Sequence, residues 1–178
     1  MRVMLIAIFL SLFFVTVNFV GAQSMESSAS SLSSTVDSYN LLWPLTAGKT
    51  ESESLYFLKL LKERISGWFI FNDTKKADYK ILIGTKRVLE AEKLLKDGNT
   101  TAASKTLEKA RSEYFSAFNH LKKAHSKNKL SAGEIRRDRL VYVKSIIDQL
   151  KTTAPQEVQE GLDSVKENAD MMLRDYLP

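Results

Sequence analysis

Apolar side chains recur at alternating steps of four and three residues along two long stretches of the chain, and this spacing predicts two tightly packed helices. In the first stretch the line consists of Ala77, Ile81, Gly84, Val88, Ala91 and Leu95. In the second it consists of Ala103, Leu107, Ala110, Tyr114, Ala117, Leu121 and Ala124. Asp73 is a natural N-cap for the first helix, and Gly98 suits the position just beyond its end. Since only a short turn joins them, helices over about 73–97 and 100–126 must lie antiparallel.

Three more helices are predicted around this pair. The segment SLYFLKLLKERIS, residues 54–66, has only a narrow polar strip, which predicts burial on most of its sides. A capping box over 131–134 opens a helix whose apolar residues include Ile135, Leu140, Val143, Ile147 and Leu150. Residues 153–156 open the last helix, which continues with Val158, Leu162, Val165, Ala169, Met172 and Tyr176. We therefore expect an all-α fold, a helical bundle of about five helices with coiled-coil-like spacing and the two long helices at its centre.

Four large apolar residues, Trp68, Phe69, Ile70 and Phe71, follow one another where the first of these five helices ends. Aromatic clusters at helix corners usually belong to a core, so we expect the four side chains to plug the end of the bundle. An exposed membrane or ligand patch is the alternative.

The first residues resemble a secretory signal peptide over 1–22. A positive start precedes the uncharged apolar run 3–20, and Val20-Gly21-Ala22 suits cleavage before Gln23. An uncleaved membrane anchor formed by residues 3–20 is the alternative, because the run is long enough to approach a bilayer span. Either way we expect an extracytoplasmic domain, secreted or at the cell surface. The serine-rich residues 23–50 predict a flexible spacer, followed by a single helical domain over 51–178.

The composition fits such a domain. The 178 residues are 44% hydrophobic and 26% charged, which is a globular balance, and only 7 Gly and 3 Pro favour long helices over many turns. The absence of cysteine excludes thiolate nucleophiles, cysteine-ligated zinc and iron–sulfur clusters.

The segments LYFLKLLKERI, FIFNDTKKAD and KRVLEAEKLLKDGN resemble a prokaryotic extracytoplasmic helical family, domain of unknown function 5667, over about residues 52–121. The chain has Ser54 where proline usually precedes the Leu-Tyr pair, and Thr74 where proline often follows the capping Asp. Both residues also suit a helix start. The resemblance implies export and a helical architecture, and it provides no catalytic or binding residue.

Candidate ligands and modification sites are sparse. His120 and His125 lie five positions apart, so a helix places them on different faces, and we expect no metal site. Asn72 and Asn99 begin N-glycosylation patterns, but each stands where a helix needs a cap, and capping is the better explanation.

The carboxylate pairs Glu90/Glu92 and Glu108/Glu113 lie in charge-rich stretches, so we expect them on solvated helix faces rather than in acid–base sites. No phosphate-binding loop, nucleophile elbow or zinc motif occurs in the sequence. We therefore expect neither enzymatic activity nor a cofactor.

The net charge of +5 is unevenly distributed. Residues 119–139, which we call the basic corner, hold seven cations against two acids: Lys122, Lys123, Lys127, Lys129, Arg136, Arg137 and Arg139. Residues 155–178 are acidic, so the two segments could attract each other within the fold. The functional interpretation is that the basic corner contacts an anionic partner.

Our leading hypothesis is a non-enzymatic exported domain that acts through contacts with an unknown protein or envelope partner. The alternative is a peripheral binder of anionic lipid or cell-wall polymer that uses the basic corner. Nucleic acid is not expected as a partner outside the cytoplasm.

Overall fold

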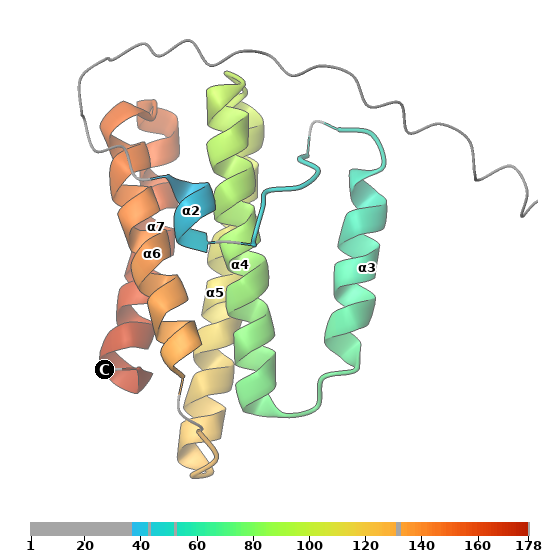
Figure 1. Cartoon of the computed structure of the whole chain (residues 1–178), viewed down its shortest axis with the longest axis vertical. Coiled ribbons are helices and arrows are strands. Elements are labelled where there is room, and N and C mark those ends of the chain that lie inside the picture. Colours follow the sequence, from blue (N-terminus) through green and yellow to red (C-terminus); the bar gives the residue numbers. More distant parts are fainter. Residues whose placement is uncertain (1–36, 43, 52, 131–132, 178) are drawn as a thin grey trace, which may run out of the picture. The chain divides into compact units, whose positions relative to one another are not determined.

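Helices make up most of the described part of the chain, and no strand occurs there (Figure 1). The computed structural model describes residues 37–42, 44–51, 53–130 and 133–177, all within the unit 34–178. The helices are α2 (Ser38–Leu42), α3 (Tyr56–Trp68), α4 (Asp73–Lys96), α5 (Thr100–Ser126), α6 (Glu134–Thr153) and α7 (Gln156–Tyr176). The predicted all-α bundle is confirmed. The predicted signal peptide or anchor and the first part of the predicted spacer lie outside the described residues.

The antiparallel pair α4 and α5 forms the centre of the fold, as the spacing predicts (Figure 1). All seven seam residues of α5 are buried, and so are those of α4 except Leu95, which is half-buried. The two helices share the most extensive contact in the described structure. Small residues in the seam allow this close approach.

Asparagine side chains cap both central helices. Asn72, rather than Asp73, is the N-cap of α4, and its Oδ1 accepts a hydrogen bond from the Lys75 backbone N–H at 3.1 Å. Asn99 caps α5 in the same way, accepting from the Ala102 N–H at 3.1 Å. Gly98 between the helices has a φ of +74°, which favours glycine. Both glycosylation-like patterns thus coincide with helix caps.

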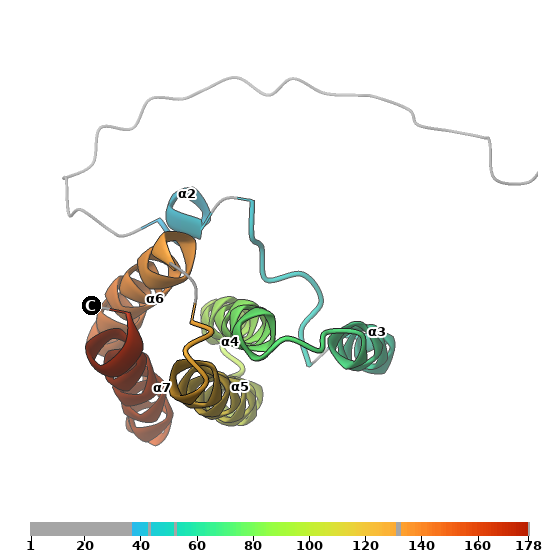
Figure 2. The same cartoon turned by 90° about the horizontal axis from the view of Figure 1, so that it is seen from below.

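A second antiparallel pair, α6 and α7, packs on the first, with α7 against α5 and α6 against α4 (Figure 2). The predicted apolar residues of both helices are buried with two exceptions. Tyr176 is half-buried, and Ile135 is exposed. Ile135, expected in the core, is 76% exposed, because the neighbouring Arg136 takes the inward position and pairs with Asp78. Ser131 of the predicted capping box lies outside the described residues, and Gly133 is the N-cap of α6.

Gly84 marks the closest approach of the two central helices. A Cβ atom at this position would lie 2.7 Å from the ring of Tyr114 on α5. That ring is fully buried, and its hydroxyl lies 3.1 Å from the Thr85 hydroxyl. The ring therefore has little freedom to move away from a larger residue at Gly84.

We expect Gly84→Ala to destabilise the domain by about 1–3 kcal/mol through overpacking, despite the better helix propensity of alanine. Urea unfolding followed by circular dichroism measures this change. The double variant Gly84→Ala/Tyr114→Leu provides the control, because the smaller side chain should relieve the clash and make the two changes less than additive. Full additivity would show that the two residues do not touch.

The domain begins slightly earlier than the expected residue 51. Helix α2 lies within the segment predicted as a flexible spacer and contacts α6. Leu42 at its end is 6% exposed and belongs to the core cluster, and Thr50 is also buried. The last residues of the predicted spacer are therefore packed against the bundle.

Helix α3 stands outside the group formed by the four long helices α4 to α7 (Figure 2). Its contact with α4 is sparse, and Tyr56 is its only buried residue. The prediction that this helix is buried on most of its sides is wrong.

Candidate functional site

The outward side of α3 is apolar and exposed to solvent. Five side chains, which we call the outer apolar face, are each between 45% and 73% exposed: Phe57, Leu58, Leu61, Ile65 and Trp68. At the helical repeat their spacing places them within about 100° of the helix circumference. Lys62 and Arg64, both exposed, flank the face. Contiguous exposed apolar side chains of this kind make the outer apolar face the candidate interaction surface.

The outer apolar face continues past the end of α3. Phe69 is 73% exposed and Phe71 is 85% exposed, while Ile70 is half-buried. The prediction that Trp68 to Phe71 plug the end of the bundle is therefore wrong. At that end of the bundle Thr74 is already buried, and its hydroxyl donates to the Lys129 carbonyl at 2.9 Å.

The inward side of α3 is polar, the reverse of an ordinary amphipathic helix. The Glu90 carboxylate on α4 is fully buried and accepts a hydrogen bond from the Tyr56 hydroxyl at 3.1 Å and an ion-pair contact from Lys59. Arg87, 2% exposed, donates to both Glu90 oxygens at 2.7 and 2.9 Å and also pairs with Glu63. One buried polar cluster thus joins the two helices, with three residues from α3 and two from α4: Tyr56, Lys59, Glu63, Arg87 and Glu90.

The buried polar cluster shifts the pKa values of Tyr56 and Arg87. Burial, followed by the neighbouring Glu90 carboxylate, raises the pKa of Tyr56, so the phenol stays protonated and donates. Burial lowers the pKa of Arg87, but the carboxylates of Glu90 and Glu63 outweigh it and raise the pKa overall. Both groups hold one protonation state across the physiological range, which suits a structural fastening rather than proton transfer.

The carboxylate pairs expected on solvated faces divide into two kinds. Glu90 and Glu92 are buried, which corrects that expectation, because each has a cation beside it: Arg87 for Glu90, and Lys96 at 2.7 Å for Glu92. Glu108 is exposed as expected, whereas its predicted partner Glu113 is half-buried and pairs with Lys80 at 2.7 Å.

The seven cations of the basic corner do not form one surface. Lys122, Lys123 and Lys129 are exposed and make no ion pair within the described residues. Lys127 is exposed but pairs with Asp73 at 2.8 Å. The three arginines are engaged or withdrawn: Arg136 is buried against Asp78, Arg137 lies 3.9 Å from Asp138, and burial lowers the pKa of Arg139.

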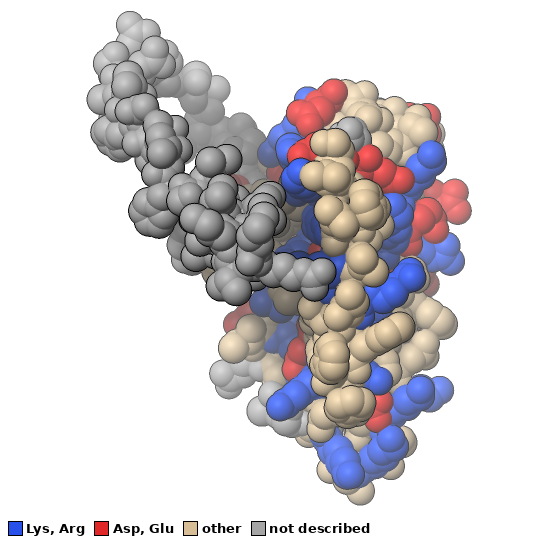
Figure 3. Space-filling view, turned by 90° about the vertical axis from the view of Figure 1, so that its right-hand side faces the viewer, with Lys and Arg blue, Asp and Glu red and all other residues tan. Residues whose placement is uncertain are grey.

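The exposed lysines lie at the same end of the domain as the aromatic end of α3. Lys127 reaches Asp73, and the Thr74 hydroxyl donates to the Lys129 backbone carbonyl at 2.9 Å. Both contacts join the end of α5 to the turn that follows Phe71. Figure 3 looks onto the side that carries α3 and shows a strip of uncharged residues with Lys and Arg gathered at its lower end. Apolar and basic groups therefore share one surface.

The acidic last helix is balanced within its own hairpin rather than by the basic corner. Asp163 and Asp170 on α7 pair with Lys151 and Lys144 on α6. The exposed lysines of the basic corner thus remain available to an external anion.

The two histidines contact different residues. His120 Nδ1 is 3.0 Å from Asp73 Oδ1, and hydrogen bonds from Lys127 and then His120 lower the pKa of Asp73 to about 2. The His125 ring lies beside the Tyr176 ring, with centroids 5.6 Å apart and the ring planes tilted by 58°. The part of the chain that the structure describes contains no group of three or more His, Asp or Glu side chains placed to hold a metal ion. In that part, too, no helix is both long and apolar enough to span a membrane.

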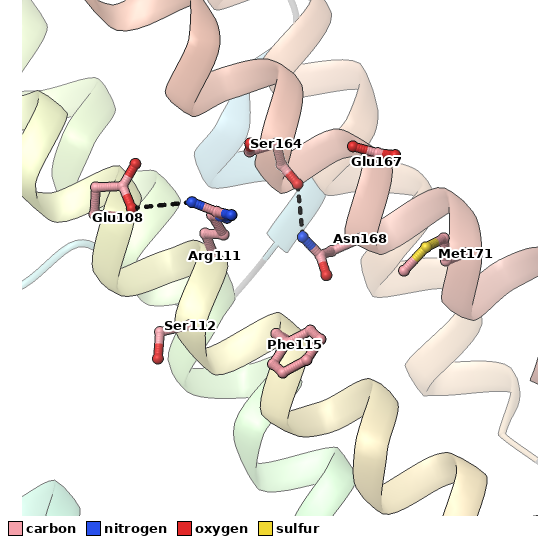
Figure 4. A pocket seen from close by; sticks show the side chains of 8 residues that line it. All are labelled: Glu108, Arg111, Ser112, Phe115, Ser164, Glu167, Asn168 and Met171. Atoms are coloured by element: carbon pink, nitrogen blue, oxygen red, sulfur yellow. Dashed lines mark hydrogen bonds and ion pairs between the residues drawn. The ribbon is translucent and has the colours of Figure 1, made fainter.

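Two of the grooves formed by the described residues are lined by α5. One of about 490 Å³ lies between α3 and the α4–α5 pair, and its lining is rich in Lys and Arg. The other, of about 420 Å³, lies between α5 and α7, where Phe115 and Arg111 face Asn168 and Met171 (Figure 4). In the second groove Asn168 already donates to the Ser164 carbonyl at 2.8 Å, and the charged residues have both signs. Its chemistry therefore favours no particular class of ligand.

The sequence profile described as Domain of unknown function (DUF5667) matches residues 50–170 of the chain. The match reaches beyond the resemblance over 52–121 and takes in α6 and most of α7. No curated protein and no solved structure matches the chain.

Proposed function

The chain belongs to the family of domain of unknown function 5667, and from its surfaces we propose that it is an exported, non-enzymatic domain that binds peripherally to membranes rich in acidic phospholipid. The outer apolar face of α3 enters the headgroup region, and the exposed lysines of the basic corner meet the headgroups. One observation carries the proposal: the apolar side of α3 faces solvent while its polar side is fixed to the protein.

An acidic bilayer fits this surface better than a second copy of the chain. Two copies meeting through the outer apolar face would bring Lys62 and Arg64 of one toward the same cations of the other. A membrane offers apolar acyl chains and negative headgroups side by side, which matches an apolar face with a basic end. The predicted export segment over 1–22 also supports a location next to a membrane, whether it is cleaved or retained.

The apolar contacts should contribute more to the free energy of membrane binding than the charges do. Full burial of one large apolar side chain in the membrane strengthens binding by about 1.5–3 kcal/mol, and each Lys near an anionic surface strengthens it by about 1 kcal/mol. Binding should therefore depend more on the outer apolar face than on the basic corner, which was the surface expected from the sequence.

We expect Trp68→Ala to weaken binding to phosphatidylglycerol-rich vesicles by about tenfold while the free energy of unfolding changes by no more than about 0.5 kcal/mol. The reason is that a side chain 73% exposed loses little packing on truncation but contributes much of the inserted area. Vesicle co-sedimentation and urea unfolding of the exported protein measure the two quantities.

Phe115→Ala provides the matched control, because Phe115 is also a largely exposed aromatic residue, but on α5 beside the α5–α7 groove. It should leave vesicle binding unchanged. A large loss of stability in Trp68→Ala with vesicle binding intact would contradict the proposal and favour the interpretation that Trp68 packs inside the bundle. If Trp68→Ala abolished self-association of the protein without changing vesicle binding, the outer apolar face would instead be a contact with a second copy or another protein.

A further inference from the structure

The groove between α3 and the α4–α5 pair has an excess of positive charge that the protein does not fully neutralise. Five Lys and Arg residues line it against two Glu. Three of the cations already have carboxylate partners: Arg87 with Glu63 and Glu90, Lys80 with Glu113 at 2.7 Å, and Lys109 with Glu51 at 2.9 Å.

Arg64 and Lys76 are the two cations of the lining that have no carboxylate partner within the described residues. Arg64 comes from the α3 wall and Lys76 from the α4 wall, so an anion in the groove would have one cation on each side. A guanidinium offers a planar fork that matches two oxygens of a phosphate, and an ammonium adds a compact third donor. The pair is therefore suited to a phosphate group.

The groove also opens beside the outer apolar face. Trp68 belongs both to that face and to the lining of the groove. A ligand with its phosphate between Arg64 and Lys76 would thus place an attached apolar chain along α3. Polar and apolar parts in this order are the chemistry of a glycerophospholipid.

We propose that this groove is a binding site for the glycerophosphate headgroup of an acidic phospholipid, with the phosphate between Arg64 and Lys76 and the acyl chains directed over Trp68. The inference rests on the proposed membrane function and adds to it a defined headgroup site. The polar cluster fixes α3 to α4 and thereby sets the width of the groove between them.

The test titrates the full chain with short-chain phosphatidylglycerol below its micelle concentration and follows amide signals by NMR. Gly67 lines the groove, whereas Gly98 lies at the far end of α4, so only the Gly67 signal should shift. We expect Arg64→Gln/Lys76→Gln to weaken this binding by at least about tenfold. Lys105→Gln/Arg111→Gln removes the same charge from exposed positions of α5 outside the groove and the basic corner, and it should change binding less than about twofold.

Equal weakening by both double variants would overturn the groove site and leave general attraction to anions, with the membrane proposal intact. Glycerol phosphate or inorganic phosphate that shifts Gly67 as strongly as the lipid would identify a soluble phosphate compound as the ligand and overturn the lipid assignment. If the short-chain lipid shifts Gly67 but the protein does not bind vesicles, the proposed membrane function fails and the headgroup site stands.

Discussion

Replacing Ala91 with aspartate is expected to destabilise the domain by at least about 4 kcal/mol, a large share of the total stability of a domain this size. Ala91 is fully buried in the seam of α4 against α5 and belongs to the core cluster. A carboxylate at this position would lose its hydration without gaining a cation, and the close helix approach leaves no path to solvent.

Urea unfolding followed by circular dichroism measures the effect of Ala91→Asp. Ser112→Asp is the matched control, because it introduces the same carboxylate on an exposed position of α5 and should change stability by about 0.5 kcal/mol or less. An unfolding midpoint for Ala91→Asp close to that of the parent would show that the seam is not packed as described.

The seam was predictable from the sequence because the four-three spacing is a property of a single helix and needs no knowledge of its partner. Thirteen seam positions were predicted, from Ala77 on α4 to Ala124 on α5, and all are buried or, in the case of Leu95, half-buried. The caps of α4 and α5 were predictable to within one residue for the same local reason, whereas α6 and α7 begin after Gly133 and Pro155, two residues later than Ser131 and Thr153 predicted. At Asn72 and Asp73 two adjacent residues could serve as the cap, and the structure uses the first.

The orientation of α3 was not predictable from its own pattern, because an amphipathic helix does not specify which side faces the protein. Its apolar residues outnumber the polar ones, and ordinary burial statistics place such a side inward. A signal did exist: Lys59 and Glu63 are four residues apart on one side of α3, and Arg87 and Glu90 are three apart on one side of α4. These spacings place opposite charges together on one side of each helix, so the two charged sides can face each other.

The exposed surface of the basic corner was likewise not predictable from the sequence alone. Its charge was visible in the sequence, but the division into exposed lysines and engaged arginines depends on partners distant in the chain. Arg136 is paired with Asp78, which lies 58 positions away. Only the fold brings that partner close, so the sequence overstated the size of the basic surface.

The second large effect is expected at Glu90, the centre of the polar cluster that fastens α3. Its carboxylate is fully buried and receives Tyr56 and Lys59 from α3 and Arg87 from α4. The outward side of α3 adds little packing to this fastening, because its five apolar side chains are each at least 45% exposed. The position of α3, and with it the groove and the outer apolar face, therefore depends mainly on the polar cluster around Glu90, with a further hydrogen bond from the Tyr79 hydroxyl to the Glu63 carbonyl at 2.7 Å.

We expect Glu90→Ala to cost about 3–5 kcal/mol, because it leaves the buried Arg87 and the largely buried Lys59 without their common partner. Part of this cost should appear as detachment of α3, seen as faster hydrogen exchange of its amides than of those in the α4–α5 seam. Glu108→Ala is the control, since it removes a carboxylate from an exposed ion pair with Arg111 and should change stability by about 1 kcal/mol or less. Glu90→Gln keeps the shape and one acceptor oxygen, so it should fall between the two. Equal stability of Glu90→Ala and Glu108→Ala would mean that α3 is held by something other than the polar cluster.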